Sequence, residues 1–377
     1  MNPNYDVIIV GLGAMGSATA YHLARRGVKV LGIDRFGVPN NMGSSSGDFR
    51  AIRSSYYEHP DYVPLLETAY QNWRDIESES GLSIIQLTGG LYIGSSESEL
   101  VAGSLRAACE HKLPHELLSH RDLSLRYPQF TLPDNYIALY EEGAGIIRPQ
   151  IAISAFAESA RNHGAVLHTN EKILEWASSD SGMRLITDQH EYFADRIVFC
   201  AGPWTDSLLA DLGVPLIVTR QVTGWVQPAR PELFGKEMFP TWALDHREGE
   251  IYYGFPILSN MQAMKVANHT RGAITDADQV NRHTSSADEE SYLPMLRTVL
   301  PDAMGSVVET NVCMYTNSTD SHFIIDSHPL FENVFLACGF SGHGFKFASV
   351  VGEVLADLAT DGRTNLPIEF LRLSRFD

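Results

Sequence analysis

The sequence predicts an α/β protein in which a discontinuous, Rossmann-like domain is interleaved with a mixed, strand-rich α+β domain. Three observations lead to this prediction. The chain opens with a strand, a glycine-rich turn, a helix and a second strand; similar strand-and-glycine elements return near residues 194–202 and 333–344; and strand-rich segments separate them. A length of 377 residues is also sufficient for two domains of ordinary size.

The first unit is typical of a dinucleotide-binding fold. Residues 5–10 form a nearly continuous apolar run, as in a parallel strand that is buried on both faces. The turn Gly-Leu-Gly-Ala-Met-Gly at residues 11–16 follows, and small and apolar residues then recur at helical spacing until Gly27. A second strand over residues 28–33 ends at Asp34. This order of elements predicts a nucleotide site rather than an isolated glycine turn.

The conspicuous residues of this unit have separate physical roles. Gly11 permits the tight turn, Gly13 lets the backbone approach a pyrophosphate, and Gly16 lets the helix and the strand pack closely. The free N–H groups at the start of the helix attract phosphates. Asp34 can accept hydrogen bonds from ribose hydroxyls, which favours FAD or NAD over NADP.

The remaining segments predict two interruptions of this domain. Short strands and a helix near residues 97–111 occupy the first interruption, and strands such as 249–255 dominate the second. A helix near 151–164, a strand at 194–202 and a strand at 333–339 with a long helix to about residue 360 belong to the nucleotide-binding part. We therefore predict a nucleotide-binding domain over residues 1–86, 145–215 and 326–377, and a substrate domain over residues 87–144 and 216–325.

Composition excludes several partners. A formal net charge of −18 argues against binding to nucleic acid or to an anionic membrane, and an anionic substrate would need local cations. The four cysteines, at positions 109, 200, 313 and 338, lack the spacing of a zinc or thiol redox site, so no metal is expected. Few cysteines and no apolar run of about 20 residues predict a cytoplasmic protein without a membrane span.

Several further blocks are long and unusual. They are Gly-Ser-Ser-Ser-Gly-Asp-Phe-Arg-Ala-Ile-Arg at 43–53, Tyr-Tyr-Gly-Phe-Pro at 252–256, Lys265 with His269, Cys-Met-Tyr-Thr at 313–316, His-Phe-Ile-Ile-Asp at 322–326 and Ser-Gly-His-Gly-Phe-Lys at 341–346. With these blocks the chain resembles, over essentially its whole length, the monomeric sarcosine oxidase family, which includes N-methyltryptophan oxidase. The resemblance implies a monomeric FAD oxidase of secondary amino acids, N-methyl or cyclic, that transfers a hydride equivalent to FAD and reduces dioxygen to hydrogen peroxide.

The resemblance also assigns roles to residues. Cys313 would form a thioether with the 8α-methyl group of the flavin, although a lone cysteine between apolar residues is usually a small buried hydrophobe. Lys265 would lie over one flavin face and assist dioxygen reduction. Its place in one of these blocks favours this role over the alternative of a solvated surface lysine. Arg50 would lie near the opposite face. Arg53 and Lys346 would hold the substrate carboxylate.

The remaining assignments concern the walls of the site. Tyr253 and Tyr315 would line the substrate cavity, and His269 and Tyr253 join Lys265 and Arg50 as expected catalytic residues. The expected contacts with the cofactor are Gly11, Gly13, Gly16, Asp34, Ser44, Arg50, Gly202, Cys313, Gly342, Gly344 and Lys346. Lys346 is predicted in the first turn of the last helix, where the macrodipole disfavours a cation and a functional role is easier to justify.

Two departures from the family concern the flavin environment. Family members usually carry histidine where Ser46 stands and threonine where Phe49 stands, and His-Ala after the second arginine is replaced by Ser54-Ser55. Sarcosine is therefore expected to be a weak substrate, with a bulkier or more apolar N-methyl or cyclic amino acid preferred.

Three alternatives remain open at this level. The chain could be a flavin dehydrogenase that passes electrons to a quinone or a protein carrier, or a flavin-binding subunit of a larger amine oxidase. The glycine turn alone also allows an NAD-dependent dehydrogenase.

Overall fold

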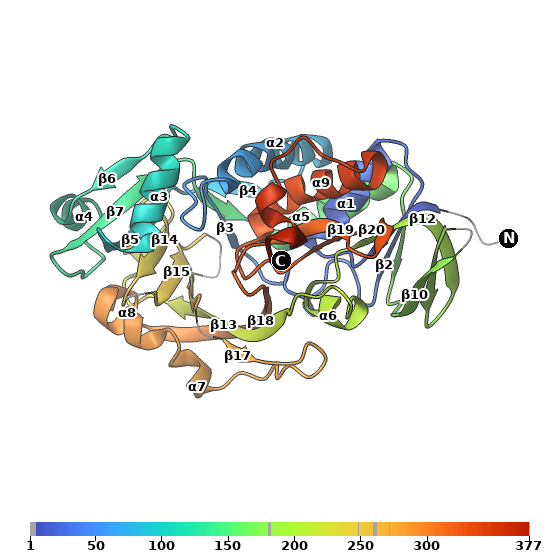
Figure 1. Cartoon of the computed structure of the whole chain (residues 1–377). Helices are drawn as coiled ribbons and strands as arrows, with labels where there is room; N and C mark the ends of the chain where they lie inside the picture. The colour runs from blue at the N-terminus through green and yellow to red at the C-terminus, as the bar shows by residue number, and fades with distance from the viewer. Residues whose placement is uncertain (1–4, 180–181, 248, 259–261, 271, 377) are drawn as a thin grey trace.

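The computed structural model describes residues 5–179, 182–247, 249–258, 262–270 and 272–376. Two large sheets dominate these residues, one near each end of the molecule in Figure 1. This architecture confirms the predicted α/β class. None of the helices in the described part of the chain is both long and apolar enough to cross a membrane.

The first sheet has eight strands, and its centre is parallel. β1 lies between β2 and β12, and β9 and β20 extend the parallel part on either side. The strands are β1 (Tyr5–Val10), β2 (Val30–Asp34), β9 (Val166–Thr169), β10 (Ile173–Ser179), β11 (Gly182–Thr187), β12 (Glu191–Phe199), β19 (Ile324–His328) and β20 (Phe331–Cys338). All four predicted strands of the nucleotide-binding part belong to this sheet.

Four helices pack together beside the first sheet. They are α1 (Ala14–Arg25), α2 (Tyr62–Ser80), α5 (Pro149–Asn162) and α9 (Ala348–Asp361). α1 contacts both α5 and α9, and the four helices lie together in Figure 1. Buried side chains of all four helices share one hydrophobic core with β1. The sequence analysis did not identify α2, although its apolar residues have helical spacing and Gly81, with a φ of 70°, ends it.

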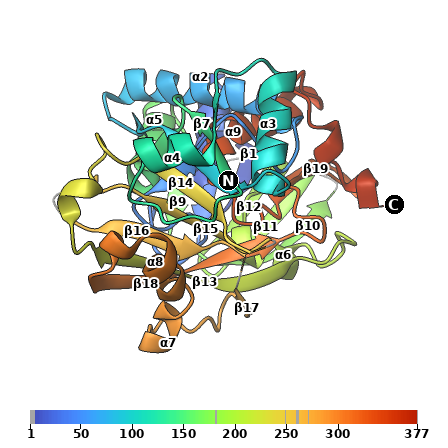
Figure 2. The ribbon, with the colours of Figure 1, turned by 90° about the vertical axis from the view of Figure 1, so that its left-hand side faces the viewer.

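The second sheet has nine strands and is largely antiparallel, with one parallel pair formed by β14 and β5. Its strands are β5 (Gly90–Ser95), β6 (Glu116–Leu118), β7 (Tyr136–Glu141), β13 (Ile217–Gln227), β14 (Thr241–Asp245), β15 (Ile251–Phe255), β16 (Met264–Asn268), β17 (Ala273–Ile274) and β18 (Ser306–Asn317). Figure 2 shows β13 and β18 on the side of the molecule opposite α2.

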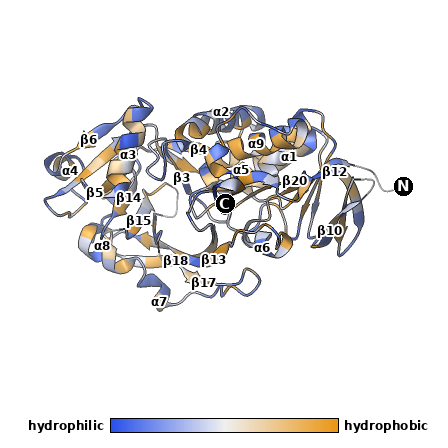
Figure 3. Cartoon of the chain, viewed as in Figure 1, coloured by the Kyte–Doolittle hydropathy of each residue, from blue (hydrophilic) through white to orange (hydrophobic). Residues whose placement is uncertain are grey.

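The smaller elements complete the fold. They are β3 (Arg50–Ile52), β4 (Ile85–Leu87), β8 (Gly145–Ile147), α3 (Glu99–Glu110), α4 (His120–Arg126), α6 (Thr205–Leu208), α7 (Ser286–Glu289) and α8 (Leu293–Val299). One face of the second sheet packs against α8 in a separate hydrophobic core. Figure 3 shows hydrophobic residues on many of the strands and on the helices, with hydrophilic residues frequent in the loops. The domain boundaries stay a prediction.

Candidate flavin and substrate site

The glycine turn between β1 and α1 has no room for side chains. Gly11 has a φ of +91°, and a Cβ there would lie 2.5 Å from the carbonyl oxygen of Cys200. A Cβ on Gly16 would lie 1.8 Å from the carbonyl oxygen of Gly11. Asp34 accepts hydrogen bonds from the backbone N–H groups of Leu12 (2.7 Å) and Phe36 (2.8 Å), which places its carboxylate beside the turn.

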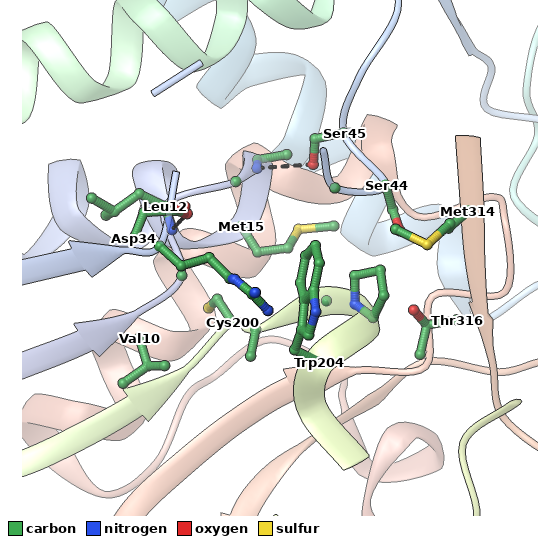
Figure 4. Close-up of a pocket in the computed structure, with 18 of the residues that line it drawn as sticks. Val10, Leu12, Met15, Asp34, Ser44, Ser45, Cys200, Trp204, Met314 and Thr316 are labelled. Atoms are coloured by element: carbon green, nitrogen blue, oxygen red, sulfur yellow. Dashed lines mark hydrogen bonds between the residues drawn. The ribbon is translucent and has the colours of Figure 1, made fainter. Parts of the chain in front are cut away.

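A cavity of about 380 Å³ opens over this turn (Figure 4). The predicted cofactor residues among those that line it are Gly11, Gly13, Asp34, Ser44, Arg50, Gly202, Gly342 and Gly344. Gly16 lies behind the turn and supports it instead of lining the cavity.

Two observations test whether a dinucleotide fits this first cavity. The hydroxyls of Ser44 and Thr316, which both line the cavity, are buried and have no hydrogen-bond partner in the described residues. α1 begins at the cavity, where the backbone N–H of Ala14 donates to the hydroxyl of Ser45 (3.2 Å) and the positive end of the helix dipole lies. Partner-less donors and a helix N-terminus both suit an anionic, hydroxyl-bearing ligand such as FAD.

The second sheet carries Lys265 and Cys313 on one face. Directly paired residues of neighbouring strands point to the same side of a sheet, and so do residues two apart along a strand. Lys265 on β16 pairs with Phe255 on β15 and with Trp225 on β13. Cys313 on β18 pairs with Gln221 on β13, four residues before Trp225. Lys265 and Cys313 therefore share a face, opposite to the face that packs against α8.

A second cavity of about 110 Å³ lies over that face. The expected residues that line it are Arg50, Arg53, Tyr253, His269, Cys313, Tyr315, Gly342 and Lys346. Arg50, Tyr315, Gly342 and Phe345 line both cavities, so the two cavities adjoin. The structure thus brings Arg53 and Lys346, which lie outside the two large sheets, together with residues of the second sheet.

Lys265 is buried and is not a surface lysine. Its side chain is 2% exposed, its Nζ donates to the carbonyl oxygen of Phe49 (3.1 Å), and it lies outside the lining of both cavities. Burial, aided by the nearby Arg50, lowers the pKa of Lys265 to about 7. The ring of Phe49 packs against Trp225 and Phe255, so this departure from the family builds an apolar wall beside the lysine.

Arg50 organises the loop between the two cavities. Its guanidinium donates to the backbone carbonyls of Ser44 (3.4 Å), Ser46 and Phe49 (3.0 Å). These contacts hold the serine-rich block of residues 44–49 around a fixed cation at the junction of the cavities.

Arg53 has an anionic partner that the sequence analysis missed. Its guanidinium contacts both carboxylate oxygens of Glu58, at 2.8 and 2.6 Å, and lies 4.2 Å from the ring centre of Tyr56. Burial alone would raise the pKa of Glu58, but Arg53 together with His343 and Lys346 lowers it to about 2. The available signal in the sequence was Glu58 itself, a carboxylate five residues after Arg53, the expected substrate anchor.

Lys346 lies just before the last helix and not in its first turn. It belongs to the 3₁₀ turn Phe345–Phe347 that precedes α9. Its Nζ donates to the carbonyl oxygen of His343 (2.7 Å) and to the hydroxyl of Tyr56 (3.4 Å), both neutral groups. Burial and then the neighbouring Arg53 lower the pKa of Lys346 to about 7.

His269 and Tyr315 form the remaining polar pair of the second cavity. The Nδ1 atom of His269 lies 3.3 Å from the hydroxyl oxygen of Tyr315. Burial lowers the pKa of His269 to about 4, so its imidazole is neutral near pH 7. In the described residues, no cluster of three or more His, Cys, Asp or Glu side chains could hold a metal ion.

Comparisons with known proteins agree with this geometry. The family model for FAD dependent oxidoreductases matches residues 6–358. The chain is 40% identical to monomeric sarcosine oxidase of Streptomyces avermitilis over 371 residues, which cover 98% of this chain and 97% of that protein. It is 34% identical to N-methyl-L-tryptophan oxidase of Salmonella dublin over 374 residues, 99% of each protein. NikD, an unusual amino acid oxidase essential for nikkomycin biosynthesis, shares the fold, with a TM-score of 0.85, 24% identity and coverage of 98% and 97%.

Proposed function

This chain belongs to the FAD-dependent oxidoreductase family, in the group of monomeric sarcosine oxidase and N-methyltryptophan oxidase, and we propose that it oxidises a secondary amino acid, N-methyl or cyclic, with dioxygen as the acceptor. The observation that carries this proposal is the junction of the cavity over the glycine turn with a smaller cavity lined by buried cations. Family membership disfavours an NAD-dependent dehydrogenase, a flavin dehydrogenase and a flavin-binding subunit. The cytoplasmic location and the monomeric state stay predictions.

The residues of the first cavity would hold FAD. The N-terminus of α1 and the glycine turn would bind the pyrophosphate, Asp34 the ribose, and the buried hydroxyls of Ser44 and Thr316 the polar edges of the ligand. Bound FAD would supply the oxidising capacity, as acceptor of a hydride equivalent from the substrate and source of the two electrons that, with two protons, convert dioxygen to hydrogen peroxide.

The residues of the second cavity would bind and orient the substrate. Among the described residues, the Nζ of Lys346 has only neutral hydrogen-bond acceptors, so Lys346 would take the carboxylate. Arg53 would support it while still paired with Glu58. Neutral His269 and Tyr315 can hydrogen-bond the amine without adding charge. The oxidised product is an imine, which water hydrolyses to the primary amino acid and an aldehyde when the N-alkyl carbon is oxidised.

Cys313 is proposed as the attachment point of the flavin. It is a free, half-buried cysteine that lines the second cavity beside Arg50 and Tyr315. We expect acid precipitation of the wild type to leave the yellow colour in the pellet, and Cys313→Ser to release it into the supernatant. Cys109→Ser, at an exposed position, is the matched control and should leave the colour in the pellet. Release of the flavin from the wild-type protein in acid would show that the linkage is not covalent.

Two residues that contact Arg50 and Lys265 predict the substrate preference. Phe49 and Ser46 place an apolar ring and a small hydroxyl where the family usually has a threonine and a histidine. We expect sarcosine to be turned over weakly and a bulkier or more apolar N-methyl or cyclic amino acid to be preferred. Peroxide release measured with sarcosine, N-methyltryptophan, proline and pipecolate tests this order. Sarcosine as the best of the four substrates would contradict it.

A further inference from the structure

Residues 275–285, which link β17 to α7, reach from the second sheet to the first cavity. Arg220 on β13 fixes the base of this segment, since its guanidinium donates to the carbonyl oxygens of Asn281 (2.7 Å) and His283 (3.0 Å). Between these two residues, Arg282 donates to the carbonyl oxygens of Asn41 (3.2 Å) and Met42 (2.6 Å). The segment is therefore bound at one side to the second sheet and at the other to the loop that follows β2.

Asp278 is the residue of this segment that lines the first cavity. Its Oδ1 atom accepts one hydrogen bond from Nη1 of Arg35 (2.8 Å) and another from Nε1 of Trp204 (2.7 Å). The guanidinium of Arg35 lies 4.9 Å from the ring centre of Trp204 and 5.0 Å from that of Phe36. All four residues line the cavity, into which Trp204 projects (Figure 4). One carboxylate thus fixes two planar groups of the cavity wall.

The charge of Asp278 matters because Arg35 directly follows Asp34. A free arginine at this position of a nucleotide fold would attract a phosphate on the ribose. The Arg35–Asp278 ion pair satisfies this cation. The hydrogen bond from Trp204 and the charge of Arg35 together outweigh burial and lower the pKa of Asp278. In this part of the cavity wall, the charges of Arg35 and Asp278 cancel, and the exposed groups are planar. Such a wall suits the uncharged nucleoside part of the ligand.

From this geometry we propose that Asp278 is a positioning residue for the cofactor, which closes the outer wall of the nucleotide cavity and retains bound FAD. The inference rests on the FAD site described above. It adds Asp278, which lies in the segment that follows β17 of the second sheet. FAD must lie in the cavity before a bond to Cys313 can form, so this retention matters most while the cofactor is bound noncovalently.

The test uses the Cys313→Ser protein, in which FAD is held only by noncovalent contacts. The rate of FAD release after dilution is measured from the rise in flavin fluorescence. Adding Asp278→Asn should speed release about tenfold, because one exposed ion pair is weakened and two hydrogen bonds lose their charged acceptor. Glu290, which follows α7, carries an exposed carboxylate. Adding Glu290→Gln is therefore the matched control and should change the rate of FAD release less than twofold.

The salt dependence of FAD release distinguishes loss of the Arg35–Asp278 ion pair from a general loss of stability. Release from the Cys313→Ser protein should become faster between low and high salt, because the Arg35–Asp278 pair is partly exposed, whereas the rate with Asp278→Asn should depend less on salt. Trp204→Phe keeps an aromatic ring and removes the second donor to Asp278, and should speed release about threefold to fivefold even if Asp278→Asn fails to fold.

Three results would overturn the inference. Release from Asp278→Asn within twofold of its parent would do so, and so would equal effects of Asp278→Asn and Glu290→Gln. A Cys313→Ser protein that retains no FAD would also overturn it, because Asp278 would then not suffice to hold the cofactor. In each of these three cases, a covalently bound flavin in the wild-type protein would still support the proposed oxidase function.

Discussion

Lys265→Met is expected to slow reoxidation of the reduced enzyme by dioxygen about 10²–10³-fold, with a much smaller effect on anaerobic reduction by substrate. A fixed cation in a buried site stabilises the negative charge that develops on dioxygen, and such a group contributes about 3–4 kcal/mol. Lys265 is suited to this role because the backbone carbonyl of Phe49 and an apolar wall hold its Nζ in place. Stopped-flow measurement of the two half-reactions separates the effects.

The charge state of Lys265 adds a pH dependence to this prediction. Burial lowers its pKa from 10.5 to about 7, so the ammonium is present below that value and is lost as pH rises through it. The reoxidation rate constant should therefore fall as pH rises through about 7, and the Lys265→Met profile should be flat in the same range. Lys236→Met, at an exposed lysine, is the control. Equal losses in both half-reactions would assign Lys265 to structure or substrate binding.

Lys346→Met is expected to lower kcat/KM for amino-acid substrates by roughly 30-fold or more. Losing one partner of a buried, charge-paired contact costs about 2–5 kcal/mol, since the other group stays buried without its partner. The Nζ of Lys346 faces neutral acceptors in the described structure, which leaves its charge for the substrate carboxylate. Amines that lack a carboxylate should be poor substrates of the wild type and should respond little to the substitution.

Arg53→Met is the informative comparison for Lys346→Met. It removes the ion-pair partner of buried Glu58, so it should also lower the free energy of unfolding, by about 3–5 kcal/mol. Lys346→Met breaks no ion pair in the described residues and should change the free energy of unfolding much less. Steady-state kinetics with thermal unfolding of both variants distinguishes recognition from stability. Equal wild-type activity on carboxylate-free amines would contradict the assignment of both residues as anchors.

Local patterns in the sequence predicted the nucleotide-binding unit well. The turn at residues 11–16 and Asp34 lie within a single strand–helix–strand unit, and their conformations depend on steric limits that act over a few residues. Helices near 97–111 and 151–164 were also predicted and lie at 99–110 and 149–162, whereas α2 was missed and α9 begins at Ala348, after the 3₁₀ turn that contains Lys346. The site residues were identified through their resemblance to a family and not through periodicity.

The sequence by itself determined the α/β class, the glycine turn with Asp34 and the kinds of side chain available for chemistry, because these depend on neighbours along the chain. Only the tertiary structure decided that Lys265 and Cys313 share one face, that Glu58 pairs with Arg53, and that Asp278 reaches Arg35 across 243 positions. Strand partners are chosen by the packing of the whole sheet. The pKa of Lys265 likewise depends on its burial among distant segments, which no local pattern in the sequence specifies.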